Sequence, residues 1–281
     1  MLGLPFRYWL KHPMTCVADV VSDPLELWEL MRDTYAHNRE RAQPACEYVA
    51  DPDWERQLHA SLGVPFPCGA TGDFRELWPK IMEELEQRGI RPGPESFQAN
   101  NDGDAGFVRT IWCLIHHLKP RRILETGVAH GVTSRFVLEA LARTGGGHLW
   151  SIDFPPFERE LRQEIGAAVG GRFADRWTFI SGSSRRRLPK VLSAIGAIDV
   201  FIHDSLHSTR NVSFELDQVW PALKPQGIAV VDDIDVNWGF HAFREQHSVA
   251  QSLVCEAEPV RPDIRRFNQK GLFGILQKPA R

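Results

Sequence analysis

Cysteine and long apolar runs are both scarce in this chain of 281 residues. Five cysteines are present, an odd number, and no two of them form a Cys-x-x-Cys pair. This usage argues against a disulfide framework and against a zinc site, and it fits a reducing cytoplasm. No apolar run approaches the length that spans a bilayer, and the opening MLGLPFRYWLKHP is too short and interrupted for a signal peptide. We therefore expect a cytoplasmic protein with no membrane span.

An excess of charge of one sign is missing as well. The chain has 33 basic and 36 acidic residues, a net charge of −3. Because basic residues do not cluster, we expect no nucleic-acid partner. The one basic triplet, residues 185–187, is interpreted as the solvated start of a helix. With 43% apolar residues, the chain is long enough for one large domain, or for one domain with an extension.

Residues 1–104 predict a helical N-terminal extension. Apolar residues at helical spacing indicate helices over 24–41 and 73–88, with Pro79 near the first turn of the second helix or at a kink. The stretch 91–104 is rich in Pro, Gly and Asn and predicts a loop. Three roles are open for this extension: a lid over a substrate, an arm that forms a homodimer, or plain helical packing.

The pattern changes after residue 104. Residues 105–118 predict a helix, and five short apolar runs then alternate with helix-length segments. Such alternation is typical of βαβ units in a mostly parallel sheet. Two further runs, 252–258 and 270–278, predict a final antiparallel hairpin. We therefore expect residues 105–281 to form an α/β domain, Rossmann-like and doubly wound, on a seven-stranded sheet whose ligands bind at the carboxyl ends of the strands.

The turn after the first predicted strand carries glycines that suit a ligand loop. Gly127 and Gly131 stand between this strand and a helix, where backbone can approach a ligand and the helix N-terminus offers N–H groups. The spacing is not Gly-x-Gly-x-x-Gly, which disfavours a dinucleotide. Asp153 ends the second strand, 26 residues after Gly127, where a carboxylate commonly holds ribose hydroxyls. An adenosyl ligand with a carboxylate tail fits both features.

These residues carry a resemblance to a known family. The segment ETGVAHGVTS (125–134), followed by SIDF (151–154), resembles the S-adenosylmethionine site of the class I methyltransferases. The resemblance implies that Glu125 lies near the methionine amino group, Ser134 near its carboxylate and Asp153 on the ribose. It places Gly182 and Ser183 beside the adenine. The full set of cofactor-binding residues that it implies is Glu125, Thr126, Gly127, Gly131, Ser134, Asp153, Gly182, Ser183 and Asp204.

Three aspartates end the fourth and fifth predicted strands. Asp204 follows the fourth strand, and Asp232 and Asp233 follow the fifth. Neighbouring strands would bring these like charges to one edge, where a cation would relieve their repulsion. Oxygen ligands without cysteine favour Mg²⁺, Ca²⁺ or Mn²⁺. The alternative is that these acids cap helices or bind cofactor and solvent separately.

The same segments resemble the metal-dependent small-molecule O-methyltransferases, of the catechol type and more closely of the rhamnosyl O-methyltransferase and cephalosporin hydroxylase-like type. The latter pattern is roughly DSDHS and then an acidic pair, and this chain has DSLHS (204–208) and DDIDVN (232–237). Leu206 stands where the pattern has a second aspartate, and leucine cannot bind a metal. His207 is the predicted general base, because its ordinary pKa suits proton removal near neutral pH. Its rivals are His130, His203 and His241.

The sequence therefore predicts an S-adenosylmethionine-dependent O-methyltransferase that acts on a hydroxyl of a small molecule, a sugar or a catechol-like compound, with a divalent metal and a histidine base. Two alternatives stay open: a metal-free or N-methyltransferase on the same fold, and a cofactor-binding protein without turnover. Residues Trp238, Phe240, His241 and Phe243 follow the fifth strand and suit either an acceptor pocket or the core.

Overall fold

The computed structural model describes residues 24–40, 47–90, 104–154, 161–258 and 271–281. The predicted loop over 91–104 lies outside these ranges except for its last residue, Asp104, which caps the helix that follows. None of the described helices is both long and apolar enough to cross a membrane.

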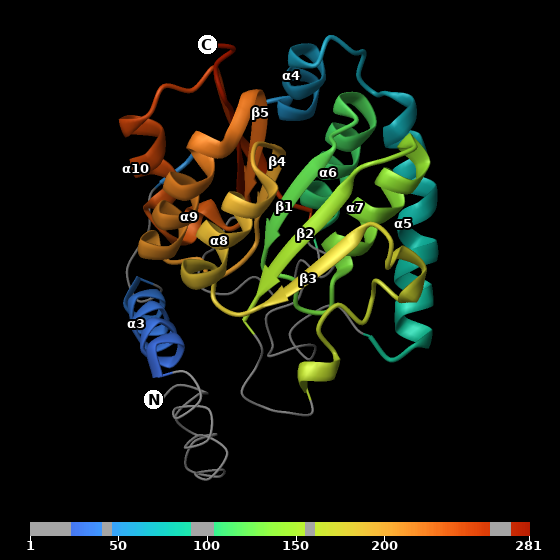
Figure 1. The fold of residues 1–281 in the computed structure, drawn as a ribbon. Coiled ribbons are helices and arrows are strands. Elements are labelled where there is room, and N and C mark those ends of the chain that lie inside the picture. Colours follow the sequence, from blue (N-terminus) through green and yellow to red (C-terminus); the bar gives the residue numbers. More distant parts are fainter. Residues whose placement is uncertain (1–23, 41–46, 91–103, 155–160, 259–270) are drawn as a thin grey trace.

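A seven-stranded sheet forms the centre of the molecule (Figure 1). Its spatial order is β3-β2-β1-β4-β5-β7-β6, and the first five strands in this order run parallel. Strand β7 runs antiparallel to both of its neighbours, β5 and β6. The predicted doubly wound sheet with a final antiparallel hairpin is confirmed. The strands are β1 (Arg122–Thr126), β2 (His148–Asp153), β3 (Trp177–Ser181), β4 (Ile198–His203), β5 (Leu223–Val231), β6 (Gln251–Glu256) and β7 (Leu272–Gln277).

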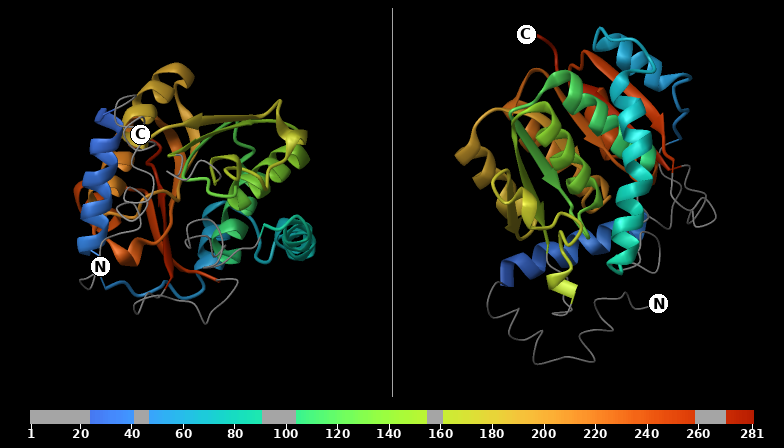
Figure 2. Two further views of the ribbon diagram at one scale, coloured as in Figure 1. Left: turned by 90° about the horizontal axis from the view of Figure 1, so that it is seen from below. Right: turned by 90° about the vertical axis from the view of Figure 1, so that its right-hand side faces the viewer.

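Helices cover both faces of this sheet, as Figure 2 shows from two further directions. One face carries α5, α6 and α7, and the other carries α8, α9 and α10. The α-helices are α3 (Pro24–Glu40), α4 (Trp54–Ser61), α5 (Gly69–Gln87), α6 (Ala105–Leu118), α7 (Val132–Thr144), α8 (Ser184–Ile195), α9 (Thr209–Ala222) and α10 (Gly239–Gln246). The described part of the chain also has three single turns of 3₁₀ helix: η2 (Leu161–Gln163), η3 (Gly171–Phe173) and η4 (Ile234–Val236).

The apolar runs of the strands become two cores because successive side chains point to opposite faces. In β4, Val200 and Ile202 pack with α6 and α7, whereas Phe201 between them packs with α9. All three are fully buried. A run that is apolar at every position therefore serves both layers, and this is why the central strands show no polar alternation in the sequence.

Residues 47–90 pack directly on the sheet domain. Phe74 of α5 lies 5.4 Å, ring to ring, from Phe136 of α7, and Leu85 is fully buried in the same core. The backbone N–H of Asp51 donates to Val254 O of the edge strand β6. A division of the chain at residue 104 stays a prediction, but side chains from both sides of that position share one core.

The predicted place of Pro79 is wrong in one respect. Helix α5 begins at Gly69 after Cys68, several residues earlier than the apolar pattern indicates, so Pro79 lies in the helix interior and not in its first turn. The N-terminal residues of α5 are small (Gly69, Ala70, Thr71), and small residues give no periodic apolar signal.

Candidate functional site

The candidate site lies where the chain leaves β1 and β4. These neighbouring strands feed helices on opposite faces of the sheet, α7 and α9, and ligands of doubly wound sheets bind at such a point. Gly127 is pressed against the other loop: a Cβ on it would lie 1.9 Å from Asp204 O. Its φ of +87° also favours glycine. The loop after β1 (residues 127–131), which is the predicted cofactor loop, is therefore in direct contact with Asp204, one of the predicted metal residues.

Glu125 is the most buried acid of the loop. Its Oε2 accepts hydrogen bonds from Ser134 Oγ and Ser151 Oγ, each at 2.6 Å, while Oε1 has no hydrogen-bond partner among the described residues. Burial raises the pKa of Glu125 to about 7, although the two serine hydroxyls lower it. A buried carboxylate oxygen without a partner is costly. It fits the ammonium of a methionine moiety, which would donate to it.

Asp153 holds the glycine loop in place. Its Oδ2 accepts the backbone N–H groups of Val128 and Ala129, at 2.9 and 2.8 Å. Burial raises the pKa of Asp153, and these hydrogen bonds act in the opposite direction. The sequence did not predict that Asp153 accepts hydrogen bonds from the backbone of the loop. The predicted ribose contact stays a prediction, with Asp153 at the expected strand end.

The other predicted cofactor-binding residues contribute either backbone geometry or a side-chain contact. Gly131 caps α7 with φ +82°, and a Cβ there would lie 2.9 Å from the Cα of Gly166. Gly182 N donates to Asp153 O at 2.9 Å, and Ser183 precedes α8 as its N-cap. Thr126 turns its hydroxyl to Glu215 at 2.5 Å, so it offers a ligand only backbone on the loop side.

Glu215 of α9 contacts several polar side chains on the β4 side of the site. Its role was not predicted from the sequence. It is fully buried, and its Oε2 lies 2.7 Å from His203 Nδ1, while Oε1 accepts from Ser205 Oγ and Asn211 Nδ2. Burial alone would raise the pKa of Glu215, but His203 and the hydrogen-bond donors leave it below its ordinary value. The signal was in the sequence: Glu215 stands on the apolar stripe of α9, between Val212 and Leu216.

The rim of the site is acidic. We use "acidic rim" for Asp204, His207, Asp232 and Asp233. One ligand atom from each of Asp204, His207 and Asp232 lies within 4.8 Å of the others. His207 Nε2 is also 3.8 Å from Asp233 Oδ2. Burial, together with Asp233 and Asp204, raises the pKa of Asp232 well above its ordinary value. The structure thus puts His207 among the candidate ligands, and the predicted set of three aspartates stays a prediction.

The rival histidines have other contacts. His203 is fully buried against Glu215, and His130 Nε2 lies 3.0 Å from Glu164 Oε2. His241 stands beside Trp238, with ring centroids 5.6 Å apart. Of the four histidines considered, His207 is the one on the acidic rim.

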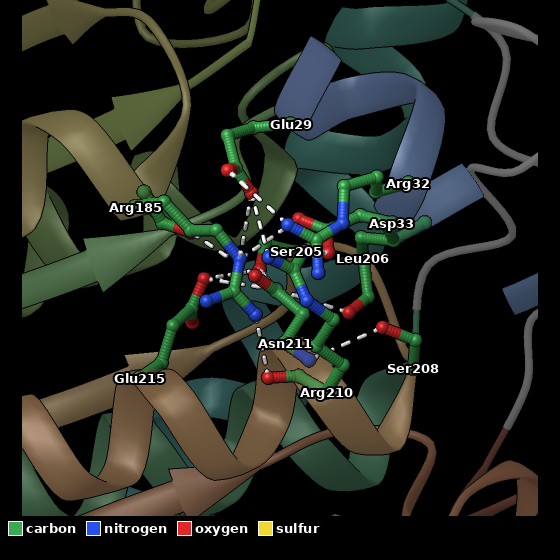
Figure 3. A network of polar contacts seen from close by, with 11 residues as sticks. Glu29, Arg32, Asp33, Arg185, Ser205, Leu206, Ser208, Arg210, Asn211 and Glu215 are labelled. Carbon is green, nitrogen blue, oxygen red and sulfur yellow. Dashed lines mark hydrogen bonds and ion pairs between the residues drawn. The ribbon is translucent and has the colours of Figure 1, made fainter. Parts of the chain in front are cut away.

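Helix α3 crosses the carboxyl ends of the strands beside the acidic rim (Figures 1 and 2). Glu40 Oε2 accepts the backbone N–H of Thr209 at 2.7 Å, and His37 Nδ1 lies 3.2 Å from His207 O. Figure 3 shows the ion-pair network farther along the helix, in which Arg210 and Arg185 both contact Glu29 and Asp33 of α3. The helix is thereby attached to the loop that carries His207.

The interpretation of residues 185–187 as a solvated helix start is wrong for Arg185. Its side chain is only 14% exposed, and its Nε lies 3.2 Å from Asp33 Oδ2. It also stacks on Phe214 at 4.5 Å. The partner acid lies about 150 residues away in sequence, in another helix, which is why charge patterning along α8 could not reveal it.

The aromatic residues after β5 divide between the two roles left open. Phe240 and Phe243 are buried in the core with α9. Trp238 is 47% exposed, and its backbone N–H donates to Thr209 Oγ1. Of these three rings, Trp238 is therefore the one that remains for the predicted acceptor site.

Comparisons with known proteins agree with this arrangement. Residues 124–234 match a family model described as a methyltransferase domain. The fold is similar to a candidate O-methyltransferase from Klebsiella pneumoniae (TM-score 0.52, 16% identity, 80% of this chain and 95% of that chain). It is also similar to the O-methyltransferase from Bacillus cereus in complex with SAH (TM-score 0.51, 13% identity, 80% and 97%). Comparison with curated protein sequences gave no match.

The class follows from the fold, the loop and the family match together. Residues 124–234 match the model of a methyltransferase domain, and the predicted resemblance to the class I S-adenosylmethionine-dependent methyltransferases is confirmed. The matched segment runs from β1 to η4, so it contains both the cofactor loop and the acidic rim.

Proposed function

We propose that this chain transfers a methyl group from S-adenosylmethionine to a hydroxyl of a small molecule, a sugar or a catechol-like compound. The observation that carries the proposal is the contact between the two halves of the site. Gly127 of the cofactor loop abuts Asp204 of the acidic rim, so a methyl donor in the loop would lie beside His207 and Asp232.

The residues of the loop match the parts of the cofactor. Glu125 Oε1, buried and without a partner among the described residues, would accept from the ammonium group. The carboxyl end of β2 carries Asp153 for the ribose, and β3 leads into Gly182 and Ser183 for the adenine. When bound, the cofactor supplies a methyl group that is already electrophilic. The remaining work of the chain is to align the acceptor and to make its oxygen nucleophilic.

His207 is the proposed general base. Its Nε2 lies 4.0 Å from Asp204 Oδ1 and 3.8 Å from Asp233 Oδ2, and these carboxylates stabilise the imidazolium that proton removal creates. Helix α3 contacts the backbone of His207 and would cover the acceptor side, which is the proposed lid role for this part of the extension.

A divalent ion, Mg²⁺ or a similar cation, is the second part of the proposal. Asp204 and Asp232 offer the oxygens that such ions prefer, and a bound ion would lower the pKa of an acceptor hydroxyl. Leu206 supplies no ligand. His207 Nε2 faces the same space, and one nitrogen cannot both bind an ion and take a proton, so its role is the point to test.

Methyl transfer from isotopically labelled S-adenosylmethionine to catechols, sugars and amines tests the function. We expect label on a hydroxyl, and we expect His207→Ala to keep cofactor affinity while turnover falls by about 10²–10⁴-fold. Label on amines alone would support the N-methyltransferase alternative. Tight cofactor binding without any transfer would support the binding protein.

Titration with Mn²⁺, followed by electron paramagnetic resonance, tests the metal. We expect Asp232→Asn to abolish binding and His207→Gln to retain it. Loss of the ion in His207→Gln would make this histidine a ligand and place the base elsewhere. Full activity in excess chelator would reject the metal while leaving the transferase intact.

A further inference from the structure

A second group of metal-binding side chains lies away from the methyltransferase site. His59 of α4, Cys68 at the start of α5 and Cys113 of α6 are all buried, and one ligand atom from each lies within 4.8 Å of the others. His59 Nε2 is 3.3 Å from Cys68 Sγ, and Thr71 Oγ1 bridges Cys68 Sγ and Cys113 Sγ at 3.3 and 3.5 Å. The cysteines are 45 positions apart in sequence, so their spacing gave no sign of this group.

The ring of His59 is oriented for binding a metal. Its Nδ1 lies 2.7 Å from the backbone carbonyl of Glu55, four residues earlier in chain order. A carbonyl oxygen only accepts, so Nδ1 carries the proton and Nε2 presents its lone pair to Cys68. Metal-binding histidines almost always have such a contact behind the ring, because it fixes the tautomer and the orientation.

A fourth candidate ligand stands beside the group. His117 follows Cys113 by four residues on α6, and side chains at this spacing lie on the same face of a helix. Its ring lies 5.9 Å from that of His59. Its Nε2 is buried and has no hydrogen-bond partner within the described part of the chain. A buried ring nitrogen without a partner is costly, and binding a metal would satisfy it.

We propose that His59, Cys68, Cys113 and His117 bind one Zn²⁺. Two thiolates and two imidazoles form a tetrahedral set that zinc commonly takes in structural sites. The group of three contains no carboxylate, so it does not suit Mg²⁺ or Ca²⁺. Neighbouring ligands of a tetrahedral zinc ion are about 3.3–3.8 Å apart, given Zn–S of about 2.3 Å and Zn–N of about 2.0 Å. The ligand atoms of His59, Cys68 and Cys113, which lie within 4.8 Å of one another, therefore need to close by only about 1 Å.

The proposed ion would fasten three helices together. Helix α4, the start of α5 and α6 meet near the amino ends of the parallel strands, opposite the cofactor loop (Figure 1). This position makes the site structural, not catalytic: the ion would hold residues 54–87 against α6. The inference is independent of the proposed methyl transfer and does not need a substrate.

Cobalt substitution of the full chain tests the site. The protein is produced with zinc, its metal content is measured after gel filtration, and the ion is then exchanged for Co²⁺. We expect about one zinc per chain and an intense thiolate-to-cobalt charge-transfer absorption. The acidic rim contains no sulfur, so cobalt bound there gives no such band.

Matched variants assign the ligands. Cys68→Ser and Cys113→Ser should lose the charge-transfer band, whereas Cys255→Ser should retain it, because Cys255 is equally buried in β6 but lies outside the group. His117→Gln should weaken binding by at least the 10–100-fold that loss of a contact behind a ligand typically costs. Unchanged affinity would remove His117 from the set.

Measurements on the wild-type protein test the zinc site even where a variant does not fold. Removal of zinc by a chelator should lower the melting temperature, and added Zn²⁺ should restore it. Absence of zinc together with absence of the cobalt band would overturn the proposal. A Cys68–Cys113 disulfide found by mass spectrometry in freshly prepared protein would overturn it as well.

Discussion

Single acids at this site do two tasks at once. Glu125 is a potential cofactor ligand and also the acceptor for two serine hydroxyls, while Asp153 anchors the loop that would enclose the cofactor. A substitution therefore changes both binding and folding unless it is chosen to separate them. The following two predictions use the amide variants for that purpose.

Glu125 should make the stability of the cofactor-free protein depend on pH. In the folded state burial raises the pKa of Glu125 to about 7, from an ordinary 4.5. Between these values the folded state keeps a proton that the unfolded state has lost, so the free energy of unfolding falls as the pH rises. The full difference is on the order of 3 kcal/mol. Urea unfolding of wild type and Glu125→Gln at about pH 5 and pH 8 measures it.

The comparison between the two proteins isolates this group, because all other titrating residues are shared. We expect wild type to lose stability relative to Glu125→Gln as the pH rises. Equal pH dependence in both proteins would mean that Glu125 ionises normally. Cofactor affinity should change in the opposite direction and rise with pH, since only the carboxylate attracts an ammonium group strongly.

Two variants of Asp153 should separate its role in anchoring the loop from its proposed role in binding the ribose. An amide oxygen in Asp153→Asn can still accept from Val128 and Ala129, so stability should change little. The lost charge should weaken cofactor binding about tenfold, or about 1.4 kcal/mol. Asp153→Ala should lose affinity and also about 1–3 kcal/mol of stability, because two N–H groups lose their acceptor. Calorimetry showing equal cofactor affinity in wild type and Asp153→Asn would exclude the ribose role.

At the residue scale, the sequence predicted which positions line the site better than it predicted which side chains contact one another. The turn after β1 needed Gly127 because the loop after β4 presses on it, and a glycine at a strand-to-helix turn is a visible signal. The partners of Glu215 and Arg185 come from other elements, so no local pattern contains them. Long-range contacts between charged groups are the part of the site that the sequence did not reveal.

At the element scale, the described side chains of α3 attach it to the rest of the molecule through ion pairs and hydrogen bonds. Leu25, Trp28 and Met31 of this helix are each more than half exposed, whereas Asp33 is buried against Arg210 and Arg185. A helix attached in this way should be less stable than one fixed by apolar packing, such as α6. Its contacts to the loop of His207 make it the element whose motion would open the proposed acceptor side.

Arg210→Ala should loosen α3 without disturbing the sheet. Arg210 contacts both Glu29 and Asp33, and its loss should cost about 1–2 kcal/mol, because hydrogen bonds to charged groups are the stronger kind. Hydrogen exchange should accelerate in α3 and stay unchanged in α6. Arg32→Ala is the matched control, since Arg32 is half exposed and 3.9 Å from Glu29. If both variants leave exchange in α3 unchanged, the network does not hold the helix.

At the scale of the whole molecule, the sequence was sufficient for the sheet. Five apolar runs separated by helices predict parallel strands, and the two further apolar runs at the end of the chain predict an antiparallel hairpin, both of which the topology confirms. Plain helical packing was among the roles predicted for the N-terminal extension, but the elements that residues 47–90 pack against were not predicted. Its apolar residues, such as Phe74 and Leu85, show only that α5 has a buried face, and not which element covers it.

This shared core makes a prediction about cooperativity. Phe74 is 2% exposed and touches the rings of Trp78, Trp112 and Phe136, two of which belong to the region after residue 104. Phe74→Ala should therefore lower the free energy of unfolding by about 3–5 kcal/mol, the usual cost of emptying a large buried ring site. Val49→Ala, at a position 86% exposed, should change it by less than about 0.5 kcal/mol.

The test is whether the loss of stability in Phe74→Ala also lowers the stability of the sheet. If residues 47–90 and the sheet unfold as one unit, then tryptophan fluorescence and far-ultraviolet circular dichroism of Phe74→Ala should shift together, in a single transition. Independent units would instead give two transitions, of which only the first responds to Phe74→Ala. In that case α4 and α5 would be a separable cover over α6. Coincident transitions would show that the layer from α5 to α7 is part of the same folding unit as the seven-stranded sheet, although α5 precedes residue 104.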